Sequence, residues 1–127
     1  DAISYNAAIS ACEKGGRWQA ALSLLGSMSS LRVLPDAISF NAAISACEKG
    51  ARWEHALSLL GRLPASKIAP NEVSYSATIS ACEKSGRWQL ALTLLNCMPA
   101  LRLFPSAYSI NAAISACEKG GRWQLAL

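Results

Sequence analysis

Apolar residues recur along the chain in two alternating blocks, each with the spacing of an amphipathic helix. They stand at i, i+3, i+4 and i+7 from residue 5 to residue 12, and again from residue 18 to residue 25. This spacing gathers the apolar side chains on one face of an α-helix. A glycine pair, Gly15-Gly16, separates the blocks and predicts the short turn of an antiparallel helix pair.

The helix pair is repeated with a period of 35 residues, without insertions or deletions. The segment from Asn6 to Trp18 returns at 41–53, 76–88 and 111–123. Prolines recur with the same period, and they predict that each second helix ends before them because proline disfavours helical backbone at the preceding residue. These prolines are Pro35, Pro70 and Pro105. We expect Pro64 and Pro99 to end the second helix sooner in the second and third units.

One helix pair cannot bury both of its apolar faces, whereas stacked pairs can. The sequence therefore predicts an all-α fold, an α-solenoid that forms a right-handed superhelix with first helices inside and second helices outside. The units span residues 2–36, 37–71 and 72–106, with a partial fourth unit at 107–127. A tryptophan begins each second helix, and we expect these rings to be buried between helices. They are Trp18, Trp53, Trp88 and Trp123.

Composition narrows the range of functions. The net charge of +4 permits a polyanionic partner, and no apolar run approaches the roughly 20 residues of a membrane span. With His55 as the only histidine and no CxxC pair, the chain offers no ligand set for a metal, and no cofactor motif is present. No nucleophile stands with a base, which argues against an enzyme. We expect four cysteines in register to be small buried residues: Cys12, Cys47, Cys82 and Cys117.

A second, polar face of the first helix repeats three kinds of side chain at helical spacing. An apolar residue recurs at Ile3, Ile38, Val73 and Tyr108. An amide or hydroxyl recurs at Asn6, Asn41, Ser76 and Asn111, and a lysine at Lys14, Lys49, Lys84 and Lys119. An apolar side chain can pack on a base, an amide can bond its edge, and a lysine can neutralise phosphate, partly offset here by the neighbouring Glu13 and its copies. Asparagine is a poor residue inside a helix, so its recurrence favours nucleic-acid binding over a merely solvated face.

Four short segments resemble the pentatricopeptide repeat family: Tyr5-Asn6, the turn at residues 12–17, the Ala-Leu-x-Leu segment at 21–24 and Pro35-Asp36. The resemblance covers the whole chain. The tetratricopeptide repeat fits less well, because its period is 34 residues and its tryptophan lies in the first helix. Two features depart from the family pattern, namely the tryptophan that begins the second helix and the lack of glycine near the end of each unit.

The resemblance implies binding of single-stranded RNA, one base per repeat, in the processing, editing, stabilisation or translation of chloroplast or mitochondrial transcripts. Other RNA-processing proteins are further candidate partners. Base reading would fall to a residue pair in each unit: Asn6 with Asp36, Asn41 with Asn71, Ser76 with Ser106, and Asn111 without its partner. The apolar row would sandwich the bases and the lysines would contact phosphate. The implied base preference from 5′ to 3′ is uracil, pyrimidine, purine, pyrimidine.

Two alternatives remain open at this point. Asp36, Asn71 and Ser106 are residues favoured at helix N-termini, so hydrogen bonding to the next helix is a structural reason for their presence. An α-solenoid can also serve as a scaffold for protein–protein interaction. That function would need varied, bulky anchors in the groove, and the repeated residues here are small and uniform.

Overall fold

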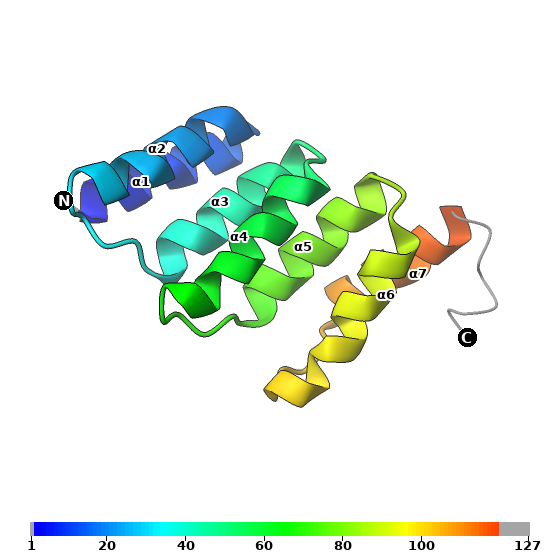
Figure 1. Ribbon diagram of the computed structural model, residues 1–127. Helices are drawn as coiled ribbons and strands as arrows, with labels where there is room; N and C mark the ends of the chain where they lie inside the picture. Colours follow the sequence, from blue (N-terminus) through cyan, green and yellow to red (C-terminus); the bar gives the residue numbers. More distant parts are fainter. Residues whose placement is uncertain (1, 120–127) are drawn as a thin grey trace.

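The computed structural model describes residues 2–119, which form seven α-helices and one 3-10 helix and contain no strand (Figure 1). The first three repeats each contribute two consecutive α-helices, and the described part of the fourth contributes one. The elements are α1 (Ala2–Lys14), α2 (Trp18–Ser30), α3 (Ala37–Lys49), α4 (Trp53–Ala65), α5 (Glu72–Lys84), α6 (Trp88–Cys97), η1 (Pro99–Leu101) and α7 (Ala107–Lys119). None of the helices in this range is long and apolar enough to cross a membrane.

The helices form two layers. The first helices α1, α3, α5 and α7 lie side by side, each in contact with the next (Figure 1). The second helices α2, α4 and α6 each pack against the first helix of their own repeat and that of the following repeat. Within the described residues, second helices do not come into close backbone contact with one another. This stacking of helix pairs confirms the predicted α-solenoid.

The residue that precedes α3, α5 or α7 caps that helix. Asp36 and Asn71 have extended backbones, and the side-chain oxygen of each accepts a hydrogen bond of 3.0 Å from the backbone N–H three residues later. The hydroxyls of Ser39 and Ser74 accept from the cap residue's own N–H, which completes a reciprocal capping box. Ser106 Oγ accepts from the N–H of Ser109 at 3.2 Å. Asp36, Asn71 and Ser106 therefore have the helix-capping role that their residue types suggest.

The expectation that Pro64 ends the second helix of its repeat is wrong, because α4 continues through Pro64 to Ala65. Proline removes only its own N–H donor, and in the last turn that loss affects a single hydrogen bond. At the same place in the next repeat, α6 ends at Cys97 and Pro99 begins η1. In both repeats the segment that follows the second helix makes the same backbone hydrogen bond. Ile68 N–H donates to Leu63 O and Leu103 N–H donates to Met98 O, each at 2.9 Å.

Two positions in each of the first three repeats have left-handed backbone. The position after the second helix is occupied by Arg32, Lys67 and Arg102, with φ of 58–60°, although none of these residues is glycine. The turn position has Gly16 and Gly86 with φ of 67° and 72°, but Ala51 with φ of 54°.

Replacing Ala51 by glycine is expected to raise the free energy of unfolding by about 0.5–1 kcal/mol. A left-handed conformation costs an L-residue about 1–2 kcal/mol, and the greater chain entropy of unfolded glycine offsets part of the gain. Urea denaturation followed by circular dichroism measures the change. Gly86→Ala is the matched control and should change stability in the opposite direction; the same sign for both variants would contradict the assignment.

The tryptophans are less buried than the sequence suggests. Trp18, Trp53 and Trp88 are partly buried and pack against the core, so the expectation of rings buried between helices is met only in part, and Trp123 lies outside the described residues. Second helices are not in close backbone contact with one another within residues 2–119, so one side of the Trp18 and Trp53 rings faces the turn of the following repeat. The Trp18 ring also lies 4.8 Å from the ring of His55 on α4. The guanidinium of Arg52 lies 4.8 Å from the centre of a Trp18 ring, and that of Arg87 lies 4.6 Å from Trp53.

The core lies between the layers and contains smaller residues than the tryptophans, together with Phe40. Phe40, Ile44 and Ile79 are completely buried. Three of the register cysteines, Cys47, Cys82 and Cys117, are buried as expected, and Cys12 in the first repeat is half-buried. Burial raises the pKa of the Cys47 and Cys82 thiols to about 11, which keeps them protonated at neutral pH.

Candidate nucleic-acid interface

Apolar side chains lie exposed in a row across the first helices. Ile3 is 81% exposed, Ile38 61%, Val73 54% and Tyr108 55%, each near the start of its helix. Because the first helices lie side by side, the row crosses four neighbouring helices at one place in each repeat. We call the surface that bears this row the first-helix face. Exposed apolar groups in a regular row are available to pack against a flat ligand.

The paired polar residues of the first two repeats meet across the repeat boundary. Asn6 Nδ2 donates to Asp36 Oδ1 at 3.3 Å, and Asn41 Nδ2 donates to Asn71 Oδ1 at 3.4 Å. The structure therefore brings together side chains that are 30 residues apart in the sequence. Sequence reasoning alone could propose these pairs only through the family resemblance.

The Asp36 carboxylate is a stable hydrogen-bond acceptor. Its partial burial by itself raises its pKa, but hydrogen bonds from the Ser39 N–H and hydroxyl and from Asn6 outweigh burial, so the pKa lies below its usual value. The Ser39 hydroxyl also donates to Asn6 Oδ1, which holds the Asn6 amide in one orientation. Asp36 is thus both a helix cap and an ionised group beside Asn6 on the first-helix face.

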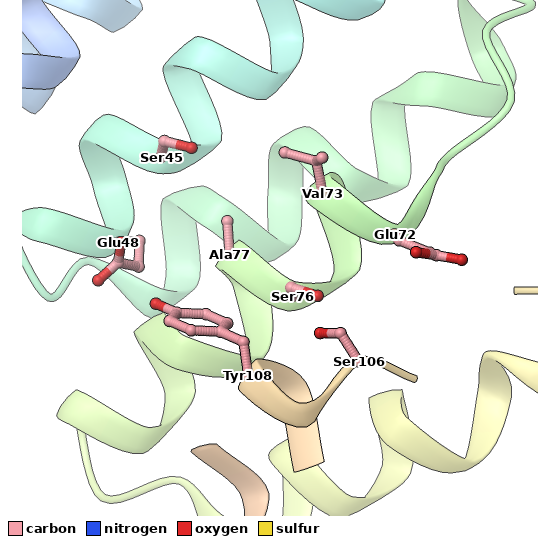
Figure 2. Close-up of a pocket in the computed structure, with 8 residues that line it drawn as sticks. All are labelled: Ser45, Glu48, Glu72, Val73, Ser76, Ala77, Ser106 and Tyr108. Atoms are coloured by element: carbon pink, nitrogen blue, oxygen red, sulfur yellow. The ribbon is translucent and has the colours of Figure 1, made fainter. Parts of the chain in front are cut away.

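The third pair has a different geometry. No hydrogen bond joins Ser76 to Ser106, and a pocket of about 400 Å³ opens around both hydroxyls (Figure 2). Val73 and Tyr108 lie at its sides, one from each of two adjacent repeats. The pocket is also lined by Ser45, Glu48, Glu72 and Ala77. Two short side chains therefore leave a hollow beside the pair, bordered by two members of the apolar row.

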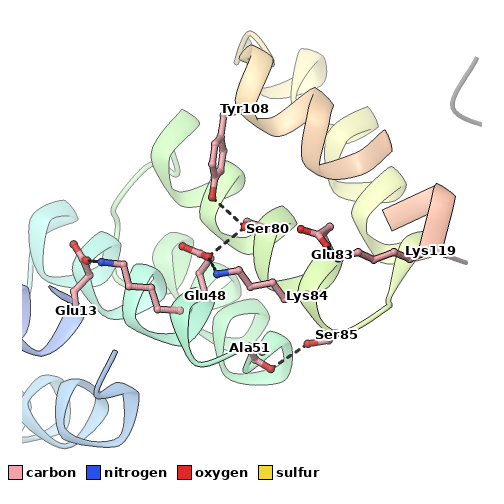
Figure 3. Close-up of polar contacts among 10 residues, drawn as sticks. Glu13, Glu48, Ala51, Ser80, Glu83, Lys84, Ser85, Tyr108 and Lys119 are labelled. Atoms are coloured by element: carbon pink, nitrogen blue, oxygen red, sulfur yellow. Dashed lines mark hydrogen bonds and ion pairs between the residues drawn. The ribbon is translucent and has the colours of Figure 1, made fainter. Parts of the chain in front are cut away.

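Tyr108 is held in place by a chain of hydrogen bonds (Figure 3). Its hydroxyl donates to Ser80 Oγ at 3.0 Å, and the Ser80 hydroxyl donates to Glu48 Oε2 at 3.3 Å. These contacts join residues of three consecutive repeats and fix the ring as one wall of the pocket. The sequence placed Tyr108 in the apolar row but gave no indication of Ser80 or Glu48 as its partners.

Lysines at the C-terminal ends of the first helices form ion pairs across each repeat boundary. Each lysine contacts the glutamate of the preceding repeat: Lys49 with Glu13, Lys84 with Glu48, and Lys119 with Glu83 (Figure 3). The three lysine side chains remain 39–58% exposed. Lys14, in the first repeat, is exposed and has no such partner among residues 2–119. The sequence suggested partial cancellation of charge, and the structure shows that it acts between repeats.

The remaining predicted residue, Asn111, lies exposed on α7 beside a second hollow that Tyr108 also lines. In residues 2–119 no three metal-ligating side chains come together. Glu72 is the pocket residue that sequence reasoning missed. The sequence alone could have pointed to Glu72, because the corresponding position in the other three repeats is an alanine: Ala2, Ala37 and Ala107.

Comparison with protein families gives two matches. Residues 1–49 match the PPR repeat family, and residues 38–68 and 73–103 each match the PPR repeat. Comparison with curated protein sequences gave no match.

Solved structures with the same fold are also pentatricopeptide repeat proteins. The chain is similar to PPR10 from maize, with a TM-score of 0.78, 24% identity and coverage of 90% of this chain and 16% of that one. It is similar to PPR10 in complex with an 18-nt psaJ RNA element, with a TM-score of 0.85, 24% identity, and coverage of 99% and 18%. It also resembles the PPR domain of Arabidopsis thaliana protein-only RNase P 1 in complex with tRNA, with a TM-score of 0.83, 17% identity, and coverage of 98% and 68%. The chain thus spans less than a fifth of the PPR10 chain.

Proposed function

The chain belongs to the PPR repeat family, and from this we propose that it binds single-stranded RNA along the first-helix face, one base per repeat. The observation that carries the proposal is the meeting of Asn6 with Asp36 and of Asn41 with Asn71 across repeat boundaries. Each pair presents amide or carboxylate groups beside an exposed apolar side chain. Bases of single-stranded RNA are recognised in this way, by stacking on side chains and by hydrogen bonds to their edges.

The pairs assign a base to each repeat. The Asn6–Asp36 pair favours uracil and the Asn41–Asn71 pair a pyrimidine, because an amide can meet the small Watson–Crick edge of a pyrimidine. Ser76 with Ser106 favours a purine, since the shorter hydroxyls leave a hollow for a larger base. Asn111 favours a pyrimidine. The members of the apolar row sandwich the bases: Ile3, Ile38, Val73 and Tyr108.

In this proposal the lysines supply affinity that does not depend on sequence. Phosphate competes with the glutamates for Lys49, Lys84 and Lys119, whereas Lys14 has no ion-pair partner among residues 2–119. Single-stranded nucleic acid releases counterions when lysines neutralise its phosphates, which lowers the logarithm of the affinity as salt rises.

Lys14→Ala is therefore expected to weaken binding to all single-stranded RNAs alike and to reduce the salt slope by about 0.7. Fluorescence anisotropy with labelled RNA at several salt concentrations measures both effects. Lys49→Ala, which also frees the Glu13 carboxylate, is the matched comparison and should affect all sequences equally as well. An unchanged salt slope in both variants would contradict phosphate contact by these lysines, and equal affinity for double-stranded RNA would contradict the proposed function.

We propose further, from the family resemblance, that the bound RNA is a chloroplast or mitochondrial transcript and that this chain binds it without cleaving it. The matched part of the RNase P neighbour is its PPR domain, which is consistent with a binding role for the repeats. Microscopy of the full reading frame fused to a fluorescent protein tests the compartment directly.

A further inference from the structure

We propose that the pocket beside Ser76 and Ser106 selects guanine, and that Glu72 is the residue that distinguishes it from adenine. The inference rests on the proposed RNA-binding function and adds a specificity-determining residue to it. Glu72 lies outside the Ser76–Ser106 pair and the apolar row.

The pocket is bordered by two members of the apolar row. Tyr108 is fixed at one side through Ser80 and Glu48, and Val73 stands at the other (Figure 2). The hydroxyls of Ser76 and Ser106 also line the pocket. A base that enters between Tyr108 and Val73 can therefore meet these hydroxyl groups at its edge.

The pocket has two carboxylates, and only one of them is available to a ligand. Glu48 is already engaged by Lys84 and Ser80. Glu72 is exposed and has neither a hydrogen-bond nor an ion-pair partner among the residues that the structure describes. It lies one helical turn before Ser76 on α5, so both side chains project from the same face of that helix.

Figure 2 shows Glu72 on the rim, at the end of the pocket away from Tyr108, with its carboxylate turned outward. Rotation about the side-chain bonds of an exposed glutamate is rapid, so the carboxylate can turn toward a bound base. From the rim, Glu72 leaves the space beside Tyr108 free. Glu72 can therefore contact the edge of a base whose faces lie against Val73 and Tyr108.

The chemistry of a free carboxylate favours guanine. An ionised carboxylate only accepts hydrogen bonds, and its two oxygens match two adjacent donors. Guanine presents such donors at N1–H and the exocyclic amine of its Watson–Crick edge, while adenine presents an acceptor at N1 and a single amine. A serine hydroxyl can donate to guanine O6 beside them. Adenine would place its N1 acceptor against the carboxylate, which is unfavourable.

A purely structural role for Glu72 makes a different prediction. An acidic residue in the first turn of a helix is stabilised by the helix dipole, and Glu72 occupies that place in α5. This effect changes stability but does not depend on the base that is bound. Glu54 occupies the first turn of α4 on the other layer and provides a control with the same charge and the same kind of helix position.

The test measures the affinity of the whole chain, by competition at low salt, for four RNAs that differ only at the base opposite the third repeat. The native chain and Glu54→Gln should prefer guanine over adenine by roughly 5- to 10-fold, the lower part of the range for a bidentate contact. Glu72→Gln and Glu72→Ala should bring the ratio close to one while the uracil preference of the first repeat is retained.

An unchanged guanine-to-adenine ratio in Glu72→Gln, with the uracil preference of the first repeat intact, would overturn this inference and leave the proposed function standing. A native chain that favours adenine or a pyrimidine at this position would overturn it as well. Loss of base preference at every repeat, or no binding of single-stranded RNA, would instead overturn the proposed function and with it this inference. Unfolding curves of the four proteins show whether a change in affinity reflects a change in stability.

Discussion

Replacing Phe40 by alanine is expected to lower the free energy of unfolding by about 3–5 kcal/mol, the usual cost of removing a core aromatic ring. Phe40 is completely buried on α3, whose neighbours are α1 and α2 of the preceding repeat, α4 of its own repeat and α5 of the following one. The guanidinium of Arg62, 5.6 Å from the ring centre, covers part of it. Truncation leaves a cavity at the centre of the array, where collapse is restricted from several sides.

The comparison variant is Trp53→Ala. Its larger ring is only partly buried, with one side against the core and Arg87 of the next turn near the ring, so we expect a smaller loss, about 1–3 kcal/mol. Urea denaturation of both variants, followed by circular dichroism, gives the two values. If Trp53→Ala proved as damaging as Phe40→Ala, the tryptophan would belong to the core after all. The Ala51→Gly background extends the measurable range if either variant is unfolded in water.

The stacked helix pairs were predictable because the sequence pattern that specifies one helix pair recurs along the chain. A strict 35-residue period, two amphipathic blocks and a glycine-rich turn leave few alternatives to stacked helix pairs. The same period identified which residues share a place on the first-helix face, so the exposed row from Ile3 to Tyr108 followed without knowledge of the structure. The helix caps at Asp36 and Asn71 were also predictable, because each cap contacts a backbone N–H only three residues later in the sequence.

Features that depend on how one repeat sits on the next were not predictable. Lys49 pairs with Glu13, 36 residues away, and periodicity alone could not distinguish this contact from the glutamate adjacent in sequence. Burial of Trp18 depends on how Arg52 and His55 of the next repeat lie against the ring, which the apolar pattern of a single helix does not reveal. The chain from Tyr108 through Ser80 to Glu48 crosses three repeats, and the free carboxylate of Glu72 became informative only once the pocket was visible.

The second large effect is expected at the first pair. Replacing Asn6 by serine, with Asp36 kept, should move the base preference of the first repeat from uracil toward guanine. Serine removes the amide that donates to Asp36 and shortens the side chain, which makes room for a larger base. The Asp36 carboxylate, ionised and no longer bonded to Asn6, is then free to accept from guanine donors. A bidentate contact of this kind discriminates by about 1–3 kcal/mol, or roughly 5- to 150-fold in relative affinity.

The second repeat provides the internal control for this variant. Asn41 and Asn71 are unchanged and lie one repeat away, so the pyrimidine preference at the second position should remain. The Ser39 hydroxyl loses its Asn6 partner but keeps its contacts with Asp36, so we expect the folded structure to be retained. Circular dichroism and a melting curve check this before binding is measured.

The central claim is that residue pairs at the repeat boundaries read bases, and it is tested most directly by one competition measurement. Native chain and Asn6→Ser are placed within a longer array of the same repeats, which raises the affinity, and are titrated against RNAs that differ only at the base opposite the first repeat. We predict that the native protein binds the uracil RNA most tightly, and that Asn6→Ser binds the guanine RNA at least as tightly as the uracil RNA. Identical preferences in the two proteins would contradict the claim, since Asn6 would then be a surface residue without a role in recognition.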